Sequence, residues 1–162
     1  MIPRVHKTEK EDRIMIHKNI SIKAEGSLKD SHLTTYILDS YEELEPNLKR
    51  PLVLICPGGA YRFTADREAE MIALHLNSAG YHAAVLRYSC APAIFPTALL
   101  EVAESIKLLK EKAEEWHIDT EKVFVMGFSA GTPPRGLHRG RGRGHFLSQR
   151  PAVLRRKPLN NV

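Results

Sequence analysis

The most informative stretch of this 162-residue sequence is Val123-Phe124-Val125-Met126-Gly127-Phe128-Ser129-Ala130-Gly131. Its four leading apolar residues predict a strand buried on both faces. The G-x-S-x-G pattern that follows is typical of a tight turn from strand to helix, with a strained serine and small residues two positions on either side. We interpret it as a nucleophile elbow with Ser129 as the catalytic nucleophile and Gly127 and Gly131 as its small residues. An ordinary turn at a strand end is the alternative.

Two more buried-strand patterns lie upstream, at residues 52–56 and 82–86, and a helical pattern follows each of them. The first helix is predicted over residues 66–79, with Asp66 as its N-terminal cap and Gly80 as its stop. The second is predicted to begin near Pro96, which is well tolerated at a first helical position. This alternation predicts an α/β fold, a mostly parallel sheet with flanking helices.

The helices should bury one apolar face each, because apolar residues recur along both with a helical period. These positions are Ala69, Ile72, Ala73 and Leu76 in the first helix and Leu99, Val102, Ala103, Ile106, Leu109, Ala113 and Trp116 in the second. Residues 14–22 alternate in polarity and residues 33–38 form another strand pattern, which predicts a hairpin or meander at the sheet edge. Residues 41–50 are predicted to form a loop.

A second candidate element, Pro57-Gly58-Gly59-Ala60, ends the strand predicted over residues 52–56. A serine that attacks a carbonyl generates an oxyanion, which backbone N–H groups must stabilise. In an elbow fold one donor is the residue after the serine, here Ala130, and the others come from a glycine-rich loop after an earlier strand. We therefore predict an oxyanion hole formed by Gly59, Ala60 and Ala130. By itself this loop would predict only the end of a strand.

With these motifs in order, residues 33–131 resemble an α/β-hydrolase of the small esterase type, similar to acetyl esterases and acetyl xylan esterase-like enzymes. The segments that resemble it are residues 54–63, 66–70, 79–82, 86–89 and 127–131. The resemblance implies hydrolysis of carboxylic esters through an acyl-serine intermediate, no cofactor, and a small-molecule ester substrate such as an acetylated carbohydrate. Ala60 departs from the glycine that is usual in this family.

The rest of a catalytic triad is not found downstream. In this fold the order is serine, acid, histidine, yet no Asp or Glu follows Ser129, and His138 and His145 lie only 9 and 16 residues beyond it. The upstream carboxylates Asp66, Glu68 and Asp119 are interpreted as cap and turn residues. We therefore expect an incomplete α/β-hydrolase fold, a truncated and impaired enzyme.

The sequence changes character at residue 132. Thr132-Pro133-Pro134 replaces the Gly-Gly-His-Leu that usually continues the elbow in this family, and we hypothesise that the chain leaves the ancestral reading frame after Gly131. Residues 1–131 are predicted to be the N-terminal portion of a hydrolase domain. Residues 132–162, rich in Arg, Gly and Pro, are predicted to be a disordered tail.

Charge divides at the same place. The formal charge of +5 combines a tail with seven Arg, one Lys and no acid with a first part that has 16 basic and 19 acidic residues. Residues 139–144, an Arg-Gly repeat, give the alternative function: a non-catalytic remnant with weak electrostatic binding to nucleic acid. Three repeats with one nearby aromatic residue do not predict specific recognition of a nucleic acid.

Several classes are not expected. No apolar run is long enough for a membrane-spanning helix, and residues 1–10 lack the apolar core of a signal peptide. The two cysteines, Cys56 and Cys90, do not predict a disulfide scaffold, and no metal-ligand spacing occurs. We expect a cytoplasmic protein without a metal that self-associates or aggregates through incompletely covered apolar surface.

Overall fold

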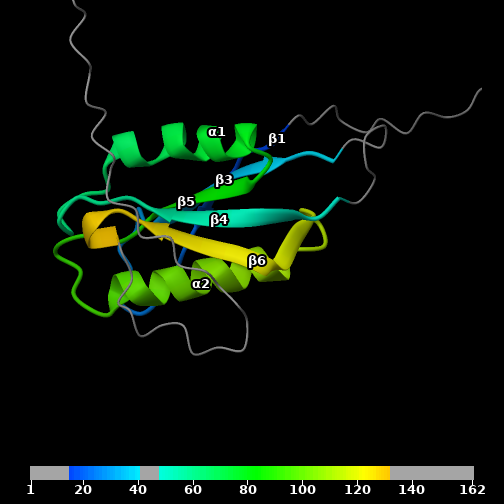
Figure 1. Cartoon of the computed structure of the whole chain (residues 1–162). Coiled ribbons are helices and arrows are strands. Elements are labelled where there is room, and N and C mark those ends of the chain that lie inside the picture. The colour runs from blue at the N-terminus through cyan, green and yellow to red at the C-terminus, as the bar shows by residue number, and fades with distance from the viewer. Residues whose placement is uncertain (1–14, 41–47, 132–162) are drawn as a thin grey trace, which may run out of the picture.

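A six-stranded sheet lies between two helices, α1 on one face and α2 on the other (Figure 1). The computed structural model describes residues 15–40 and 48–131. The strands are β1 (Met15–Ile16), β2 (Asn19–Ser21), β3 (His32–Leu38), β4 (Arg50–Cys56), β5 (His82–Arg87) and β6 (Ile118–Gly127). The helices are α1 (Glu70–Ser78) and α2 (Thr97–Glu111), together with two 3-10 turns, η1 (Asp66–Glu68) and η2 (Ser129–Gly131). The predicted α/β architecture is confirmed.

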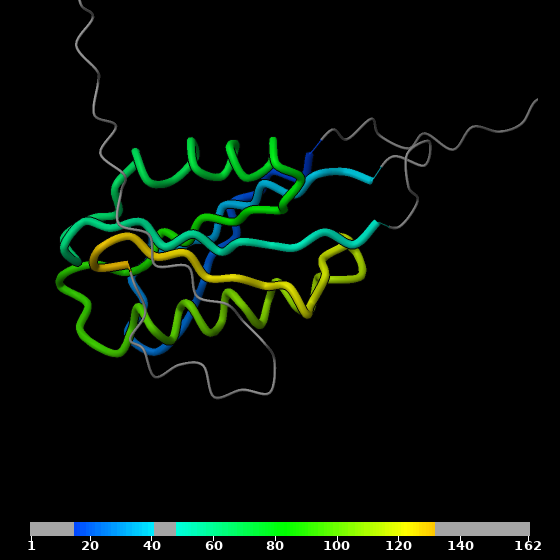
Figure 2. The backbone as a smooth tube through the Cα atoms, viewed as in Figure 1, coloured from blue at the N-terminus to red at the C-terminus, as the bar shows by residue number. Residues whose placement is uncertain are grey.

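The strand order is β1-β3-β5-β4-β6, and β2 also pairs with β3. Strand β4 runs parallel to β5 and β6, whereas β3 runs antiparallel to β5 and to the two short N-terminal strands. A parallel core with an antiparallel addition at its edge agrees with the prediction. The carboxyl ends of the three parallel strands share one edge of the sheet, and Figure 2 shows the turns that follow them gathered at one end of the molecule.

Strand β4 is buried on both faces, as its continuous apolar run predicts. Leu52 and Leu54 pack in the cluster between the sheet and α2, whereas Val53 and Ile55 pack in the cluster on the α1 side. Each such side chain contributes about 2 kcal/mol when it is fully buried. The turn after β4 therefore follows a run of buried residues, 52–56, that contacts the core on both faces of the sheet.

The first helical segment differs from its prediction at the N-terminal end. Residues 66–68 form η1, α1 begins only at Glu70, and its N-cap is Ala69, with no side-chain cap. The prediction of Asp66 as a cap is wrong, because Asp66 lies within η1 and α1 begins four residues later. Its exposed carboxylate pairs with the Arg87 guanidinium at 2.9 Å. Gly80 follows the end of α1, as predicted.

The second helix differs in which residues face the core. It ends before Trp116, which is buried from the turn beyond the helix. Ala103 is exposed, contrary to the prediction, and Glu101 is fully buried. The Glu101 carboxylate accepts hydrogen bonds from the hydroxyl of Ser27 and from the hydroxyl and backbone N–H of Ser89. These donors explain how a carboxylate can lie on the buried face.

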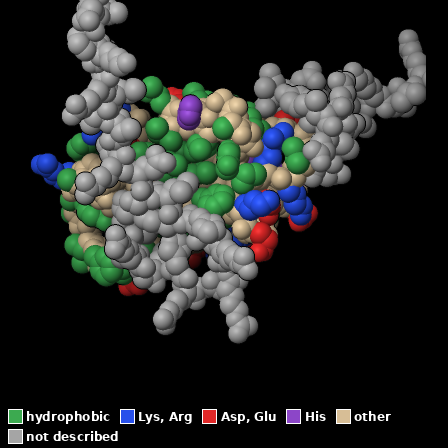
Figure 3. Space-filling view, viewed as in Figure 1, with side chains coloured by type: hydrophobic (Ala, Val, Ile, Leu, Met, Phe, Trp, Pro, Cys, Tyr) green, Lys and Arg blue, Asp and Glu red, His purple; other side chains and the backbone are tan. Residues whose placement is uncertain are grey.

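Strand β6 is the last strand of the sheet, so that within the described residues it is paired along one edge only. Residues 123–126 were predicted to be buried on both faces, but they are only half-buried, because no further described strand covers the outer edge of β6. Figure 3 shows hydrophobic side chains on the side of the molecule where β6 faces the viewer. The exposed Met71 and Leu74 of α1 add further apolar surface.

No helix in residues 15–40 and 48–131 is long and apolar enough to cross a membrane. Ile14, residues 41–47 and the predicted tail 132–162 lie outside the described residues.

Candidate active site

The predicted elbow and the predicted glycine-rich turn leave the sheet side by side, at the carboxyl ends of β6 and β4. The last residues in register between these parallel strands are Cys56 and Gly127. The backbone N–H of Phe128 continues this ladder by donating to the Cys56 carbonyl oxygen at 3.1 Å. Because the two strands end together, Ser129 comes to lie beside Gly58.

Ser129 is exposed and has a left-handed backbone conformation, with a φ of 51°. Non-glycine residues rarely adopt this conformation, and holding one there costs about 1–3 kcal/mol. The N–H of Gly131 donates to the Phe128 carbonyl oxygen at 2.9 Å and closes the turn around the serine. A strained serine directly after a parallel strand fits the tight turn that the G-x-S-x-G pattern predicts.

Two glycines allow the turns to approach one another. A Cβ atom on Gly131 would lie 2.2 Å from the carbonyl oxygen of Cys56. A Cβ atom on Gly58 would lie 2.6 Å from the carbonyl oxygen of Phe128 and 3.2 Å from the Cβ of Ser129. The closest atoms belong to the backbone, so that side-chain rotation cannot relieve the clash. Any larger residue at either position would push the two turns apart.

The turn after β4 contains three consecutive residues with positive φ: Gly59 at 147°, Ala60 at 54° and Tyr61 at 56°. A Cβ atom on Gly59 would lie 1.9 Å from the Phe63 carbonyl oxygen, so only glycine fits there. Ala60 adopts a conformation that glycine would adopt more easily. Position 60, where the sequence departs from the family that it resembles, is therefore one where alanine adds strain.

The backbone N–H groups of Gly59, Ala60 and Ala130, the predicted oxyanion donors, have no acceptor among the described residues. The N–H groups of Tyr61 and Ser129 at the same edge also have none. The neighbouring N–H of Gly58 is engaged, because it donates to Glu68 Oε2 at 2.8 Å. Unpaired N–H groups beside a strained serine are suited to stabilise a negative charge that develops on a carbonyl oxygen.

Glu68 is the residue of this site that was not predicted from the sequence. It was interpreted as a cap or turn residue, but its carboxylate lies under the glycine-rich turn and its side chain is 22% exposed. A carboxylate ten residues beyond a glycine is not a recognisable pattern. Asp119 has the predicted turn role, since it accepts the N–H of Glu121 at 3.1 Å. The hydrogen bond from Lys122 lowers the pKa of Asp119.

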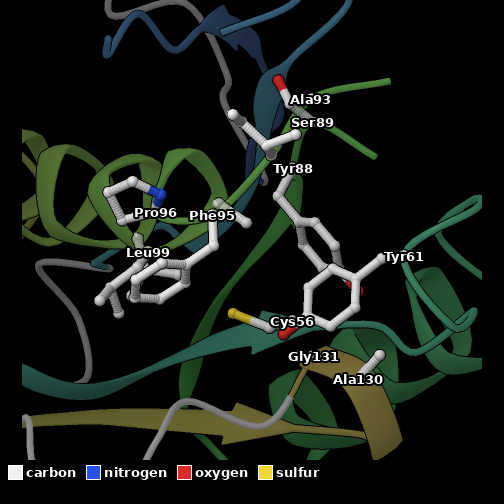
Figure 4. Close-up of a pocket in the computed structure, with 13 residues that line it drawn as sticks. Cys56, Tyr61, Tyr88, Ser89, Ala93, Phe95, Pro96, Leu99, Ala130 and Gly131 are labelled. Atoms are coloured by element: carbon white, nitrogen blue, oxygen red, sulfur yellow. The ribbon is translucent and has the colours of Figure 1, made fainter. Parts of the chain in front are cut away.

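A cavity of about 320 Å³ opens beside the elbow (Figure 4). Its walls come from the ends of β4 and β5, the loop before α2, the first turns of α2 and the elbow itself. The lining residues are Cys56, Tyr61, Tyr88, Ser89, Ala93, Ile94, Phe95, Pro96, Ala98, Leu99, Val102, Ala130 and Gly131. Most of them are apolar, so the cavity favours an uncharged group next to the serine.

The polar side chains of this cavity are structural. The Tyr88 hydroxyl donates to the Pro57 carbonyl oxygen at 2.6 Å, and burial raises the pKa of this phenol. Its ring meets that of Tyr61 edge-on, with centroids 6.1 Å apart. Burial also raises the pKa of the Cys56 thiol to about 12, so that it stays protonated and unreactive at neutral pH. Ser129, in contrast to Cys56, is exposed.

No histidine or carboxylate forms a hydrogen bond with the Ser129 hydroxyl within residues 15–40 and 48–131. His82 is buried at the amino end of β5, at the opposite edge of the sheet, where it bonds to the His117 carbonyl oxygen. His138 and His145 lie outside the described residues. No group of three or more His, Cys, Asp or Glu in the described part of the chain could hold a metal ion.

A sheet of this strand order, with a strained serine after its last parallel strand and an adjacent glycine-rich turn, defines the class of α/β hydrolases. The family model BD-FAE matches residues 38–133, more than half of the chain, and the chain belongs to that family. A curated relative, endo-1,4-beta-xylanase B of Butyrivibrio fibrisolvens, is 29% identical over 90 residues, which cover 53% of this chain and 14% of that protein.

Solved esterase-type structures are similar as well. MGS-M1, an α/β hydrolase from a Medee basin deep-sea metagenome library, is 42% identical with a TM-score of 0.68, over 73% of this chain and 48% of that one. An acetyl ester-xyloside bifunctional hydrolase from Caldicellulosiruptor lactoaceticus is 37% identical with a TM-score of 0.58, over 63% and 35%. A carboxylesterase from Lactobacillus plantarum WCFS1 is 27% identical with a TM-score of 0.63, over 73% and 42%. This chain therefore spans half or less of the length of each of these relatives.

Proposed function

We propose that this chain provides the nucleophile and the oxyanion donors for hydrolysis of carboxylic esters, with Ser129 as the acylated residue. One observation supports this most strongly. The strained Ser129 lies beside a turn whose Gly59 and Ala60 amides, together with that of Ala130, have no partner among the described residues. Sequence alone offered an ordinary strand-end turn as the alternative, and such a turn needs neither the strain nor the free amides.

The reaction begins with attack of the Ser129 hydroxyl oxygen on the ester carbonyl carbon. A bond forms between them, the carbonyl electrons move onto oxygen, and the three amides stabilise that charge. Collapse of this intermediate breaks the bond to the alcohol, which leaves with the proton that the serine lost. Water then attacks the acyl-serine and releases the carboxylic acid.

The substrate that we propose is a small ester, with an acetylated carbohydrate as the leading candidate. Two relatives support this choice, an acetyl ester-xyloside bifunctional hydrolase and an endo-1,4-beta-xylanase. The apolar cavity beside Ala130 and Gly131 supports an uncharged group next to the scissile bond. Neither a metal nor a cofactor has a part in this proposal.

We further propose that the 162-residue polypeptide by itself reacts slowly. No Asp or Glu follows Ser129 in its sequence, so that no acid–histidine pair in the usual order activates the serine. When triad members are removed from a serine hydrolase, the oxyanion donors and substrate binding still leave roughly 10³–10⁴-fold acceleration over water. We expect this residual level of activity.

A fluorophosphonate probe tests both parts, because it phosphonylates nucleophilic serines. The expected result is slow labelling that peptide mapping assigns to Ser129, with none in Ser129→Ala. Ser78→Ala, which removes an exposed hydroxyl at the end of α1, is the matched control and should label like the wild type. Equal labelling of Ser129→Ala would refute the assignment of the nucleophile, and a rate like that of an intact esterase would refute the impairment.

The predicted division of the chain at residue 132 stays a proposal, and so does the departure from the ancestral reading frame after Gly131. The family match supports the division, because it ends at residue 133. The nucleotide sequence tests the frame: the other frame should encode hydrolase-like sequence with an Asp and a His. The nucleic-acid alternative concerns residues 139–144, outside the described residues, and no structural observation favours it.

A further inference from the structure

The hydrogen bond between Gly58 and Glu68 joins the glycine-rich turn to the short helix η1. The Gly58 N–H donates to Glu68 Oε2 at 2.8 Å, while Glu68 Oε1 lies 3.6 Å from Nε of the exposed Arg67. The bond therefore ties the backbone of the turn to a side chain that is itself largely shielded from water.

This turn needs such support, because its backbone is strained at two consecutive residues, Ala60 and Tyr61, which follow Gly59. Each sparsely populated conformation costs on the order of 1–3 kcal/mol and persists only where surrounding contacts fix it. Other groups hold the carbonyl oxygens of the turn: Ala65 donates to that of Gly58 at 2.8 Å, and Ala91 donates to that of Tyr61 at 2.7 Å. Glu68 is the group that takes up one of its N–H donors.

Glu68 also lies close to the nucleophile. The point that a Cβ atom on Gly58 would occupy is 3.0 Å from Glu68 Oε2 and 3.2 Å from the Cβ of Ser129. The carboxylate and the serine are thus separated by little more than the space of one carbon atom. A displacement of the Glu68 side chain would therefore disturb Gly58 and the neighbouring backbone at Ser129.

We propose that Glu68 is a positioning residue, whose carboxylate accepts the Gly58 N–H and so holds residues 57–61 in the conformation that leaves the Gly59 and Ala60 amides free for the oxyanion. This inference rests on the proposed function. It assigns Glu68 no role as a base, because its Oε2 is engaged by Gly58 and no hydrogen bond joins it to Ser129. A carboxylate this near would also repel a developing oxyanion, so that the benefit comes from the acceptor oxygen and not from the charge.

Two substitutions separate these contributions. Glu68→Gln keeps an acceptor oxygen and removes the charge, whereas Glu68→Ala removes both. The matched control is Glu70→Ala, two residues further along and exposed. The measurement is fluorophosphonate labelling of Ser129 in the full chain, resolved into a saturating rate constant and a half-saturating probe concentration.

We expect Glu68→Ala to lower the saturating rate constant about tenfold or more, compared with the 10²–10³-fold that loss of a whole oxyanion donor costs. The half-saturating concentration should change less than twofold. Glu68→Gln should stay within about threefold of the wild type, and Glu70→Ala should not differ from it. A role in fold stability alone would lower the free energy of unfolding but leave the saturating rate constant of the folded protein unchanged.

An independent readout is hydrogen exchange of the Gly58 amide, which should be protected in the wild type and in Glu68→Gln and unprotected in Glu68→Ala. Wild-type labelling rates in Glu68→Ala would overturn the inference while leaving Ser129 as the nucleophile. Should Glu68→Ala fail to fold, Glu68→Gln decides alone: near-wild-type labelling supports the inference, and a loss as large as tenfold overturns it. Failure of the proposed function is a separate result, in which wild-type Ser129 is not labelled.

Discussion

Lowering the pH should destabilise this protein through one buried histidine. His82 is fully buried at the start of β5. Its Nδ1 accepts the N–H of Leu38 at 3.2 Å, so that Nε2, which lies 3.2 Å from the His117 carbonyl oxygen, holds the proton and donates. The ring is thus satisfied in its neutral form, and burial lowers the pKa of His82 to about 4.

The magnitude follows from this pKa and from an ordinary value of about 6.5 in the unfolded chain. The lowered pKa gives stability that is fully present above pH 6.5 and is lost as the pH falls toward 4, because the unfolded state binds the proton first. Between pH 7.5 and pH 5 the free energy of unfolding should fall by about 2 kcal/mol from this residue alone. That change lowers a urea midpoint by about 1 M.

The assay is urea unfolding of the full chain at several pH values between 7.5 and 5, followed by circular dichroism. His82→Gln removes the titrating group and should lose this part of the pH dependence, whereas His75→Gln, on the exposed side of α1, should keep it. Protonation of carboxylates with a lowered pKa, such as Asp119, also lowers the free energy of unfolding in acid. This contribution is the same in the wild type and in both variants, so that it cancels in the comparison. An unchanged pH dependence in His82→Gln would refute the reasoning.

Two further predictions concern the packing around the site. Glu101→Ala removes the buried acceptor of three hydrogen bonds from Ser27 and Ser89, and should lower the free energy of unfolding in urea by about 3 kcal/mol. Glu104→Ala, on the exposed side of α2, should change this free energy by less than about 0.5 kcal/mol. Equal effects of the two substitutions would contradict the role of the buried network. Gly131→Ala places a methyl group 2.2 Å from a backbone oxygen of β4. It should lower the free energy of unfolding by about 1–3 kcal/mol and abolish fluorophosphonate labelling of Ser129. Unaltered labelling would show that the two turns need not approach so closely.

Local pattern was enough for most of the elements. Residues 52–56, 82–86 and 123–126 all lie in strands, as their short, mainly apolar runs predict, although 123–126 are only half-buried at the end of the sheet. The prediction of which helix residues face the core was less accurate. Ala103 was assigned to the core by its period, but Glu101 is buried, since partners that are far away in sequence satisfy its carboxylate.

The sequence by itself determined the α/β class, the parallel core and the tight turn at Ser129, because all three depend on the polarity and size of neighbouring residues. Only the tertiary structure decided that β5 lies between β3 and β4 and that Glu68 reaches Gly58 beneath the elbow. The tertiary structure also places the Asp66 carboxylate in an ion pair with Arg87 and not at a helix N-terminus. The physical reason is that hydrophobic burial is non-directional and leaves a periodic trace along the chain. A hydrogen bond or ion pair instead needs two particular atoms a few ångströms apart, and only the path of the folded backbone brings them together.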